Sequence, residues 1–344
     1  MTQRHSLNFR PRAALWPIAV TALLALAGCE AGGPTEQKPA VATQGKWTVA
    51  RAEGQGALAS VWGSGPSDVW AAGGRSGHGL ILHSDGETWR EVPTAIPGFV
   101  WWIYGSGAHN VYAVGEAGLI WHYDGATWSS VPSGTTKTLY GLWAASADDV
   151  WAVGGDPEGV PGSAVLLRGN AKGFQPVAVP AGLLPSALFK IDGSPAGGVV
   201  AVGAGGTILH FDGAWHRDQV PTDSALVSLW GGGGSQLYAV GGDATGVLLH
   251  FDGATWHNVA GVQAGLQLFG VFKAPGQPVY AVGAGPRVVE MDSHAGPRDA
   301  DLPELGPATV LHSVWGDGHG RVYAAGGTLY GGQPSMTGVL LERR

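Results

Sequence analysis

The chain has 344 residues, of which 13% are charged and 59 are glycine. Beyond the three arginines of the first 28 residues, it carries 16 basic and 26 acidic residues, a formal net charge of −10. This balance argues against nucleic acid as a partner, because binding to phosphates depends on Lys and Arg. Cys29 is the only cysteine, which excludes disulfides, thiolate metal sites and a cysteine nucleophile in the folded part of the chain.

The first 28 residues have the pattern of an export signal. Arg4, Arg10 and Arg12 precede an apolar run over residues 13–27, and no acidic residue interrupts them. As a helix this run would reach about 22 Å, short of the roughly 30 Å hydrocarbon core of a bilayer. We therefore predict a cleaved signal peptide over residues 1–28 and not a membrane span.

Leu26, Ala27, Gly28 and Cys29 resemble the lipobox of bacterial lipoproteins. The resemblance implies that Cys29 is lipidated and becomes the mature N-terminus, and more than one acyl chain would hold the protein on a bilayer. Residues 29–45 are rich in Gly, Pro and small residues, which predicts a flexible tether. The expected location is the cell envelope, at the outer membrane or the cell surface; a chance cysteine after an ordinary signal peptide is the alternative.

Residues 58–93 form a unit that recurs almost to the C-terminus. Short apolar runs separated by Gly-rich turns predict four strands, and Asp85-Gly86 predicts a hairpin between the third and fourth. The apolar position of the first strand recurs every 38 to 49 residues, at Leu58, Val100, Leu139, Leu188, Leu226, Leu268 and Leu311. This period and four strands per unit predict an all-β, seven-bladed β-propeller of four-stranded antiparallel blades over residues 46–344.

The last unit ends after its third strand, and residues 46–52 supply the missing fourth one. Trp47 matches the aromatic position of the fourth strands, at Trp89, Trp128, Phe174, Trp215 and Trp256. We therefore predict that the N-terminal strand completes the last blade and closes the ring, which would remove two exposed sheet edges.

Two families of propeller repeat resemble this unit. The turn at Ser84, Asp85, Gly86, Thr88 and Trp89 is similar to the bacterial Asp-box repeat, although its Asp and Gly are one residue closer together. The Gly pairs after the second strand, such as Gly73-Gly74, are similar to the kelch repeat. The resemblance implies a propeller fold and does not select one function, because propellers include binding proteins, assembly factors and glycan-active enzymes.

Repetition argues against metal and cofactor sites in this sequence. One histidine per blade ends the third strand at His83, His122, His210 and His250, which predicts a side chain that hydrogen-bonds its own Asp-Gly turn. The glycine-rich loops lack a following Gly-Lys-Ser/Thr, so they do not predict phosphate binding. We predict no metal ligands, no cofactor and no catalytic residues.

Residues that break a repeated column are the first candidates for a site. Trp102 and Lys190 occupy a first-strand position where the other units have Ser or Gly, and Asp192 replaces the aromatic residue that ends this strand. Since first strands line the axis of a propeller, we predict a binding site at the channel mouth. The alternative is that Trp102 fills space and Lys190 pairs with Asp192 or another acid.

The loops between the second and third strands share one face and form a second candidate surface, since recognition often resides on loops of a rigid scaffold. Random sequence variation in solvent-exposed turns would explain the same pattern equally well. The candidate residues on this face are Arg75, His78, Glu116, Asp156, Glu158, Asp243, Arg287 and Tyr330.

These observations favour a lipid-anchored envelope propeller that acts as a monomeric binding or assembly module for an envelope protein or glycan. The alternatives are a glycan-active hydrolase or lyase of the sialidase-like propeller type and a purely structural role. Two or more acids with an Arg or Tyr around the axial mouth would favour an enzyme, whereas Gly, Ala and Trp alone would favour a binding protein.

Overall fold

A computed structural model describes residues 45–344, except residues 55, 76, 195–197, 232–233, 235, 263–264, 275, 293–295 and 330–335. The predicted signal peptide, Cys29 and the tether lie outside the described residues. In the part of the chain that is described, no helix has the length and apolar content of a membrane span.

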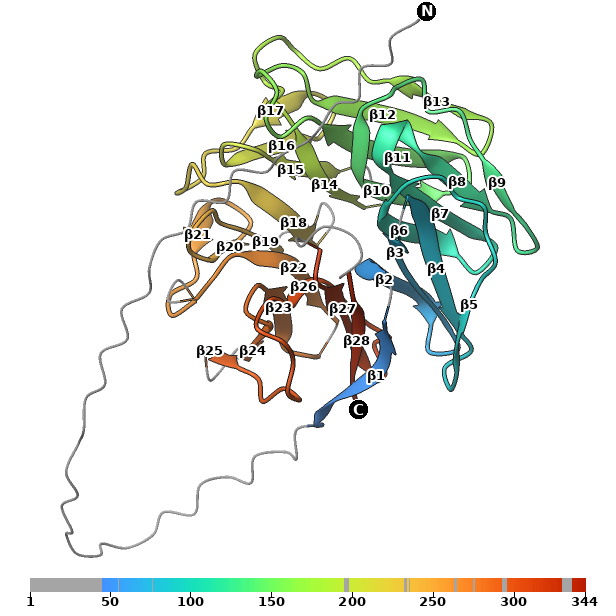
Figure 1. Ribbon diagram of the computed structural model, residues 1–344. Coiled ribbons are helices and arrows are strands. Elements are labelled where there is room, and N and C mark those ends of the chain that lie inside the picture. The colour runs from blue at the N-terminus through green and yellow to red at the C-terminus, as the bar shows by residue number, and fades with distance from the viewer. Residues whose placement is uncertain are drawn as a thin grey trace, which may run out of the picture. The chain divides into compact units, whose positions relative to one another are not determined.

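The described residues form seven four-stranded antiparallel sheets arranged as the blades of a propeller (Figure 1). Blade one consists of β2 (Ala57–Gly65), β3 (Asp68–Arg75), β4 (His78–Ser84) and β5 (Trp89–Glu91). Blade two consists of β6 (Val100–Gly107), β7 (Asn110–Gly115), β8 (Ile120–Tyr123) and β9 (Trp128–Ser130), with a 3-10 turn at Glu116–Gly118. Blade three consists of β10 (Thr138–Ser146), β11 (Asp149–Gly155), β12 (Val165–Asn170) and β13 (Gly173–Pro176).

The other four blades repeat this order. Blade four consists of β14 (Leu188–Gly193), β15 (Val199–Gly203), β16 (Thr207–Phe211) and β17 (Trp215–Arg217). Blade five consists of β18 (Leu226–Trp230), β19 (Leu237–Gly241), β20 (Val247–Phe251) and β21 (Trp256–Asn258). Blade six consists of β22 (Leu268–Lys273), β23 (Val279–Gly283), β24 (Arg287–Asp292) and β25 (Gly296–Asp299). Blade seven consists of β26 (Val310–Gly316), β27 (Val322–Gly327), β28 (Gly338–Arg343) and β1 (Trp47–Glu53).

The predicted ring closure is confirmed. Strand β1 pairs antiparallel with β28, with Trp47 opposite Arg343 and Val49 opposite Leu341. Trp47 is buried against blade six, where its ring meets Tyr280 edge-on and its Nε1 donates to Glu290 Oε1 at 3.2 Å. The first strands complete the ring, because each contacts the first strands of both neighbouring blades and β26 contacts β2.

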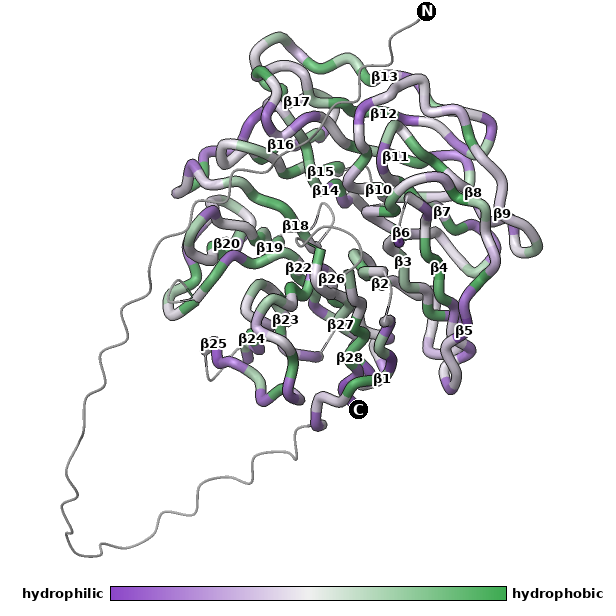
Figure 2. Tube along the Cα trace, viewed as in Figure 1, coloured by the Kyte–Doolittle hydropathy of each residue, from purple (hydrophilic) through white to green (hydrophobic). Residues whose placement is uncertain are grey.

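Hydrophobic side chains fill the space between blades. Each of seven core clusters combines residues of two adjacent blades, so both faces of every sheet are buried. This explains why the middle strands carry apolar residues at both parities, as Val69, Trp70, Ala71 and Ala72 do in β3. Figure 2 shows that middle strands such as β19 and β23 are mostly hydrophobic, whereas the outer strand β5 is hydrophilic.

The Asp-Gly turns form the predicted hairpins between third and fourth strands. Strand β4 pairs with β5 so that Ser84 lies opposite Trp89. Asp85 Oδ1 accepts hydrogen bonds from the backbone N–H groups of Glu87 and Thr88 at 3.0 and 2.8 Å, and Gly86 has a φ of +94°. These backbone donors hold the pKa of the Asp85 carboxyl below its usual value. Asp124 and Asp252 accept the same pair of backbone bonds, so these three repeated aspartates are turn formers.

A β-bulge near the start of each first strand was not predicted. In every blade the ladder to the second strand skips one residue, for example Ala59 between Leu58 and Ser60, and Trp101 between Val100 and Trp102. A bulge changes the direction in which the local side chain points. The skipped residues are Ala59, Trp101, Tyr140, Phe189, Val227, Phe269 and His312.

Candidate functional site

The main cavity lies on the propeller axis, within the circle of first strands, and has a volume of about 680 Å³. We call it the axial funnel. Serines at the carboxyl ends of three first strands also line it, at Ser64, Ser106 and Ser194. The aromatic side chains that line it are Trp62, Trp102, Tyr104, Trp143, Trp230, Phe272 and Trp315.

The three residues predicted for the channel mouth all line this funnel. Lys190 is only 6% exposed, and its Nζ lies 2.8 Å from the ring centroid of Trp102. Trp102 is fixed in turn, because its Nε1 donates to the backbone oxygen of Leu142 in blade three at 3.1 Å. The contact therefore joins blades two, three and four at the base of the funnel.

Burial lowers the pKa of Lys190 well below its usual value, and the nearby carboxylate of Asp192 opposes this shift. The low exposure of Lys190 and its contact with the face of Trp102 both remove the amine from water. The base of the funnel is thus a polar spot within an aromatic lining.

Asp192 connects blade four to blade five. Its Oδ2 accepts a hydrogen bond from the backbone N–H of Gly231 at 3.1 Å, and its Oδ1 accepts one from Gly193 at 2.9 Å. Its charge also adds to the effect of burial in raising the pKa of Tyr104, whose hydroxyl interacts with Trp143. Asp192 therefore has a structural role together with its position on the funnel wall.

Among the described residues that line the funnel, Asp192 is the one carboxylate and Lys190 the one basic group. The remaining lining consists of Trp, Tyr, Phe, Ser, Gly and aliphatic residues. The active site of a sialidase-like hydrolase or lyase would place a second acidic residue or an arginine close to Asp192. The described lining instead offers stacking surfaces and one polar pair, which suits binding.

Five of the seven bulged residues form an aromatic chain that runs between blades. Phe189 lies 5.4 Å from Tyr140 between ring centroids, Tyr140 lies 5.8 Å from Trp101, and Trp101 lies 6.4 Å from His312. His312 in turn lies 4.6 Å from Phe269. Trp101 of blade two meets His312 of blade seven because blade one, which lies between them, has only Ala59 at this position.

His312 is the polar member of this chain, and its Nε2 is buried without a hydrogen-bond partner among the described groups. Burial, with a smaller effect of Lys190, lowers the pKa of His312 to about 3, so the ring is neutral at pH 7. The sequence reasoning missed the aromatic chain. The position that indicates this chain in the sequence is the residue directly after the first apolar residue of each unit, which is aromatic in five units.

The loop-face candidates separate into two groups. Arg75, His78 and Glu116 come together around a cavity of about 250 Å³, with Phe99 and Trp101 on its wall. Arg75 forms an ion pair with Glu91 at 2.7 Å, and Glu116 Oε2 accepts a hydrogen bond from the backbone of Phe99 at 2.9 Å. These contacts position the charged groups beside the aromatic chain.

The other loop-face residues do not join this cavity. The loop after β11 contains Asp156 and Glu158, where Asp156 Oδ1 accepts the backbone N–H of Glu158 at 3.1 Å. Asp243 is exposed beyond β19, and Arg287 forms an ion pair with Asp299 of the same blade at 2.6 Å. Tyr330 lies outside the described residues.

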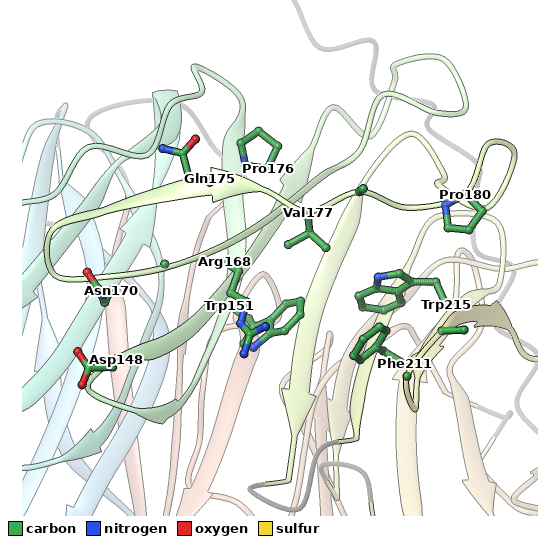
Figure 3. A pocket seen from close by; sticks show the side chains of 14 residues that line it. Asp148, Trp151, Arg168, Asn170, Gln175, Pro176, Val177, Pro180, Phe211 and Trp215 are labelled. Atoms are coloured by element: carbon green, nitrogen blue, oxygen red, sulfur yellow. The ribbon is translucent and has the colours of Figure 1, made fainter.

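A groove between blades three and four was not predicted (Figure 3). Its volume is about 670 Å³, and Trp151 and Arg168 on one side face Phe211 and Trp215 on the other. The Arg168 guanidinium lies 4.8 Å from the Trp151 ring centroid and bonds Asp149 at 2.6 Å. This groove is a second concave surface with aromatic walls.

Three of the four repeated histidines, His83, His122 and His250, have structural contacts, but the prediction named the wrong partner for them. His83 Nε2 contacts Asp68 Oδ1 at 2.7 Å and its ring stacks on Trp70 at 4.0 Å. His122 contacts Asn110 and His250 contacts Gln236 in the same way. The partner is thus the residue at, or directly before, the start of the second strand, because the antiparallel ladder brings that strand end beside the end of the third.

The chain matches no protein-family model and no curated protein. Among solved structures, it is similar to YCF48 bound to D1 peptide, with a TM-score of 0.64, 14% identity and coverage of 88% of this chain and 98% of that one. A streptogramin B lyase has a TM-score of 0.66 at 12% identity, with coverage of 88% and 98%. The WD40 β-propeller domain of Doa1 has a TM-score of 0.65 at 12% identity, with coverage of 86% and 97%. At these identities the similarity shows the propeller fold alone.

Proposed function

We propose that this protein is an exported, lipid-anchored propeller of the cell envelope that binds a segment of a partner protein in its axial funnel. The observation that carries the proposal is the funnel lining, which combines seven aromatic side chains with one buried Lys and one Asp. Aromatic rings supply large contact areas at low cost in conformational entropy, and a few fixed polar groups orient a ligand.

The dimensions and polarity of the funnel agree with a peptide ligand. Its volume of about 680 Å³ is within the usual range for ligand pockets, about 300 to 1,000 Å³. Ser64, Ser106 and Ser194 offer hydroxyl groups that can hydrogen-bond a peptide backbone. The YCF48 propeller bound to D1 peptide provides a precedent for peptide binding by this fold, and WD40 propellers share the architecture.

The lipobox-like sequence at Cys29 and the tether of residues 29–45 support the envelope location. A flexible tether of 16 residues after the anchor has a root-mean-square reach of about 20 to 25 Å. This length would place the propeller close to the membrane surface while leaving it free to rotate toward a partner. We propose that the protein is monomeric and that it needs no cofactor for binding.

A glycan-active enzyme is the second candidate. It draws support from the streptogramin B lyase among the similar structures, which shows that the fold can hold an enzyme. Asp192 and Lys190 in one cavity could supply a carboxylate and an amine to such a reaction. The two candidate functions predict different ligands in the funnel in the native envelope: a protein segment for the binding protein and a glycan for the enzyme.

Site-specific photocrosslinking in the native envelope tests the proposal. A benzoylphenylalanine residue replaces Ser106 at the funnel or, as a matched control, Ser129 on the outer strand of the same blade; both serines are exposed. We expect a discrete, protease-sensitive adduct from position 106 alone. The same adducts from both positions would contradict a funnel site, and a protease-resistant, glycosidase-sensitive adduct from position 106 would favour the glycan alternative.

A further inference from the structure

Three potential metal ligands meet on the outer hairpin of blade four. His210 of β16 and His216 of β17 lie directly opposite each other in the ladder, and their rings are 5.1 Å apart at an interplanar angle of 31°. Asp218 follows His216 by two residues, so both side chains are on the same side of the hairpin. One ligand atom from each residue lies within 4.8 Å of the other two.

The distances between these atoms suit a shared ion better than direct hydrogen bonds. His216 Nε2 lies 3.6 Å from Asp218 Oδ1, and His210 Nδ1 lies 3.9 Å from Asp218 Oδ2. Both separations exceed a hydrogen bond. Ligand atoms at about 2.1 Å from a tetrahedral ion are about 3.4 Å apart, so small side-chain movements would complete the site.

Two further residues are positioned as the outer partners that metal ligands usually have. Trp256 of blade five donates from Nε1 to Asp218 Oδ2 at 2.9 Å, which orients the carboxylate. Asp212 Oδ1 lies 3.9 Å from Nδ1 of His216, on the side of the ring away from Asp218. At this distance Asp212 is not hydrogen-bonded to His216, but a small movement of the exposed carboxylate would bring it onto the ring N–H, where it would fix the tautomer of the ligand and increase its basicity.

Asp218 breaks a column of apolar residues. Its backbone N–H bonds the oxygen of Ile208 at 3.0 Å, and Val92, Val131, Val177 and Val259 make the equivalent bond in blades one, two, three and five. Blade five also has a cross-strand histidine pair, His250 and His257, but there the carboxylate position is Val259. In that blade His250 contacts Gln236 and His257 contacts Asp252. Among the described residues, blade four is thus the one blade where a carboxylate lies within reach of both facing histidines.

We propose that His210 Nδ1, His216 Nε2 and the Asp218 carboxylate bind one divalent ion of the Zn²⁺ class. Two imidazoles and one carboxylate are a common ligand set for Zn²⁺ with an open coordination position. The His216 side chain is 47% exposed, so water or a carboxylate of a partner has access to that position. The site is separate from the axial funnel, and it does not depend on partner binding there.

Zn²⁺ titration of the full-length chain, freed of metal with a chelator and purified in detergent, tests the site. We expect His216→Ala and Asp218→Val each to weaken Zn²⁺ binding by calorimetry at least tenfold, and Asp212→Asn to weaken it by about tenfold through the outer carboxylate. Asp218→Val introduces the residue that four other blades have, and His216 is exposed, so both variants should fold. His257→Ala in blade five is the matched control and should leave the affinity unchanged.

Substitution of Co²⁺ for Zn²⁺ gives a second readout. A tetrahedral nitrogen and oxygen site should produce visible absorption bands in the unmodified chain and lose them in His216→Ala. The proposal is overturned if the unmodified chain binds Zn²⁺ no more tightly than His216→Ala does. It is equally overturned if His257→Ala weakens Zn²⁺ binding as much as His216→Ala.

Discussion

Replacing Trp47 by alanine tests the closure of the ring. The side chain is 2% exposed, packs in the cluster between blades six and seven, and meets Tyr280 edge-on. Removing a buried Trp side chain costs about 3 to 5 kcal/mol, including the cavity that it leaves. The lost hydrogen bond should not enlarge this range, since Glu290 retains Arg298 at 3.0 Å and Arg343 at 3.4 Å.

The assay is urea unfolding of the full-length chain, followed by far-UV circular dichroism. Val49→Ala is the matched control on the same strand, because its side chain is 44% exposed and should contribute less than about 1 kcal/mol. We expect Trp47→Ala to lower the unfolding midpoint well below that of Val49→Ala. Equal midpoints for the two variants would refute the idea that β1 stabilises the ring through Trp47.

Three further predictions concern the anchor, a buried histidine and a turn. Cys29→Ser should move the protein from the membrane fraction to the soluble fraction and abolish palmitate labelling, and an unchanged distribution would contradict a lipid anchor. His312 has a folded pKa of about 3 against 6.5 for the free side chain, so its neutral form supports stability above pH 6.5 and this contribution is lost as the pH falls toward 3. The free energy of unfolding, measured in urea between pH 7 and 5, should therefore fall less in His312→Phe than in the unmodified chain. The difference between the two should grow by about 1.4 kcal/mol per pH unit below pH 6.5, and identical pH profiles would contradict this. The Asp252 carboxyl, which accepts backbone N–H bonds from Thr255 and Ala254, should titrate by NMR with a pKa of about 2, and a value near 3.8 would show that the turn does not hold it.

The sequence predicted the propeller because the fold repeats its physical constraints. Each blade must bury both faces and turn tightly between its strands, so the seven units share one apolar pattern, and four of them turn at Asp-Gly. The closure by Trp47 followed from the same logic, since the last unit lacked a fourth strand. Repetition thus supplied several independent observations of each structural position.

The site was only partly predictable, because it depends on residues that depart from the repeat. Trp102, Lys190 and Asp192 stood out in aligned columns, and the structure brings all three into one cavity. The aromatic chain through Trp101 and His312 depended on a bulge, whose direction the sequence does not indicate. The groove at Trp151 could not be predicted, because side chains from two neighbouring blades form it and the pattern within one repeat does not show how they meet.

The histidine at position 210 shows how averaging over repeats conceals a local site. Its column was interpreted as structural, and His83, His122 and His250 do hydrogen-bond the second strand. Only the combination with His216 and Asp218 distinguishes blade four. A comparison of the residue three positions after each fourth-strand aromatic would have revealed Asp218 among four valines and one alanine.

The most direct test of partner binding in the funnel compares photocrosslinking and thermal stability in Trp102→Ala. The variant carries benzoylphenylalanine at position 106, and crosslinking is measured in the native envelope beside the melting temperature of the same protein. We predict that the adduct is lost at temperatures where the variant remains folded, because Trp102 supplies the stacking surface above Lys190. An undiminished adduct together with a lower melting temperature would contradict this and would show that Trp102 only fills space.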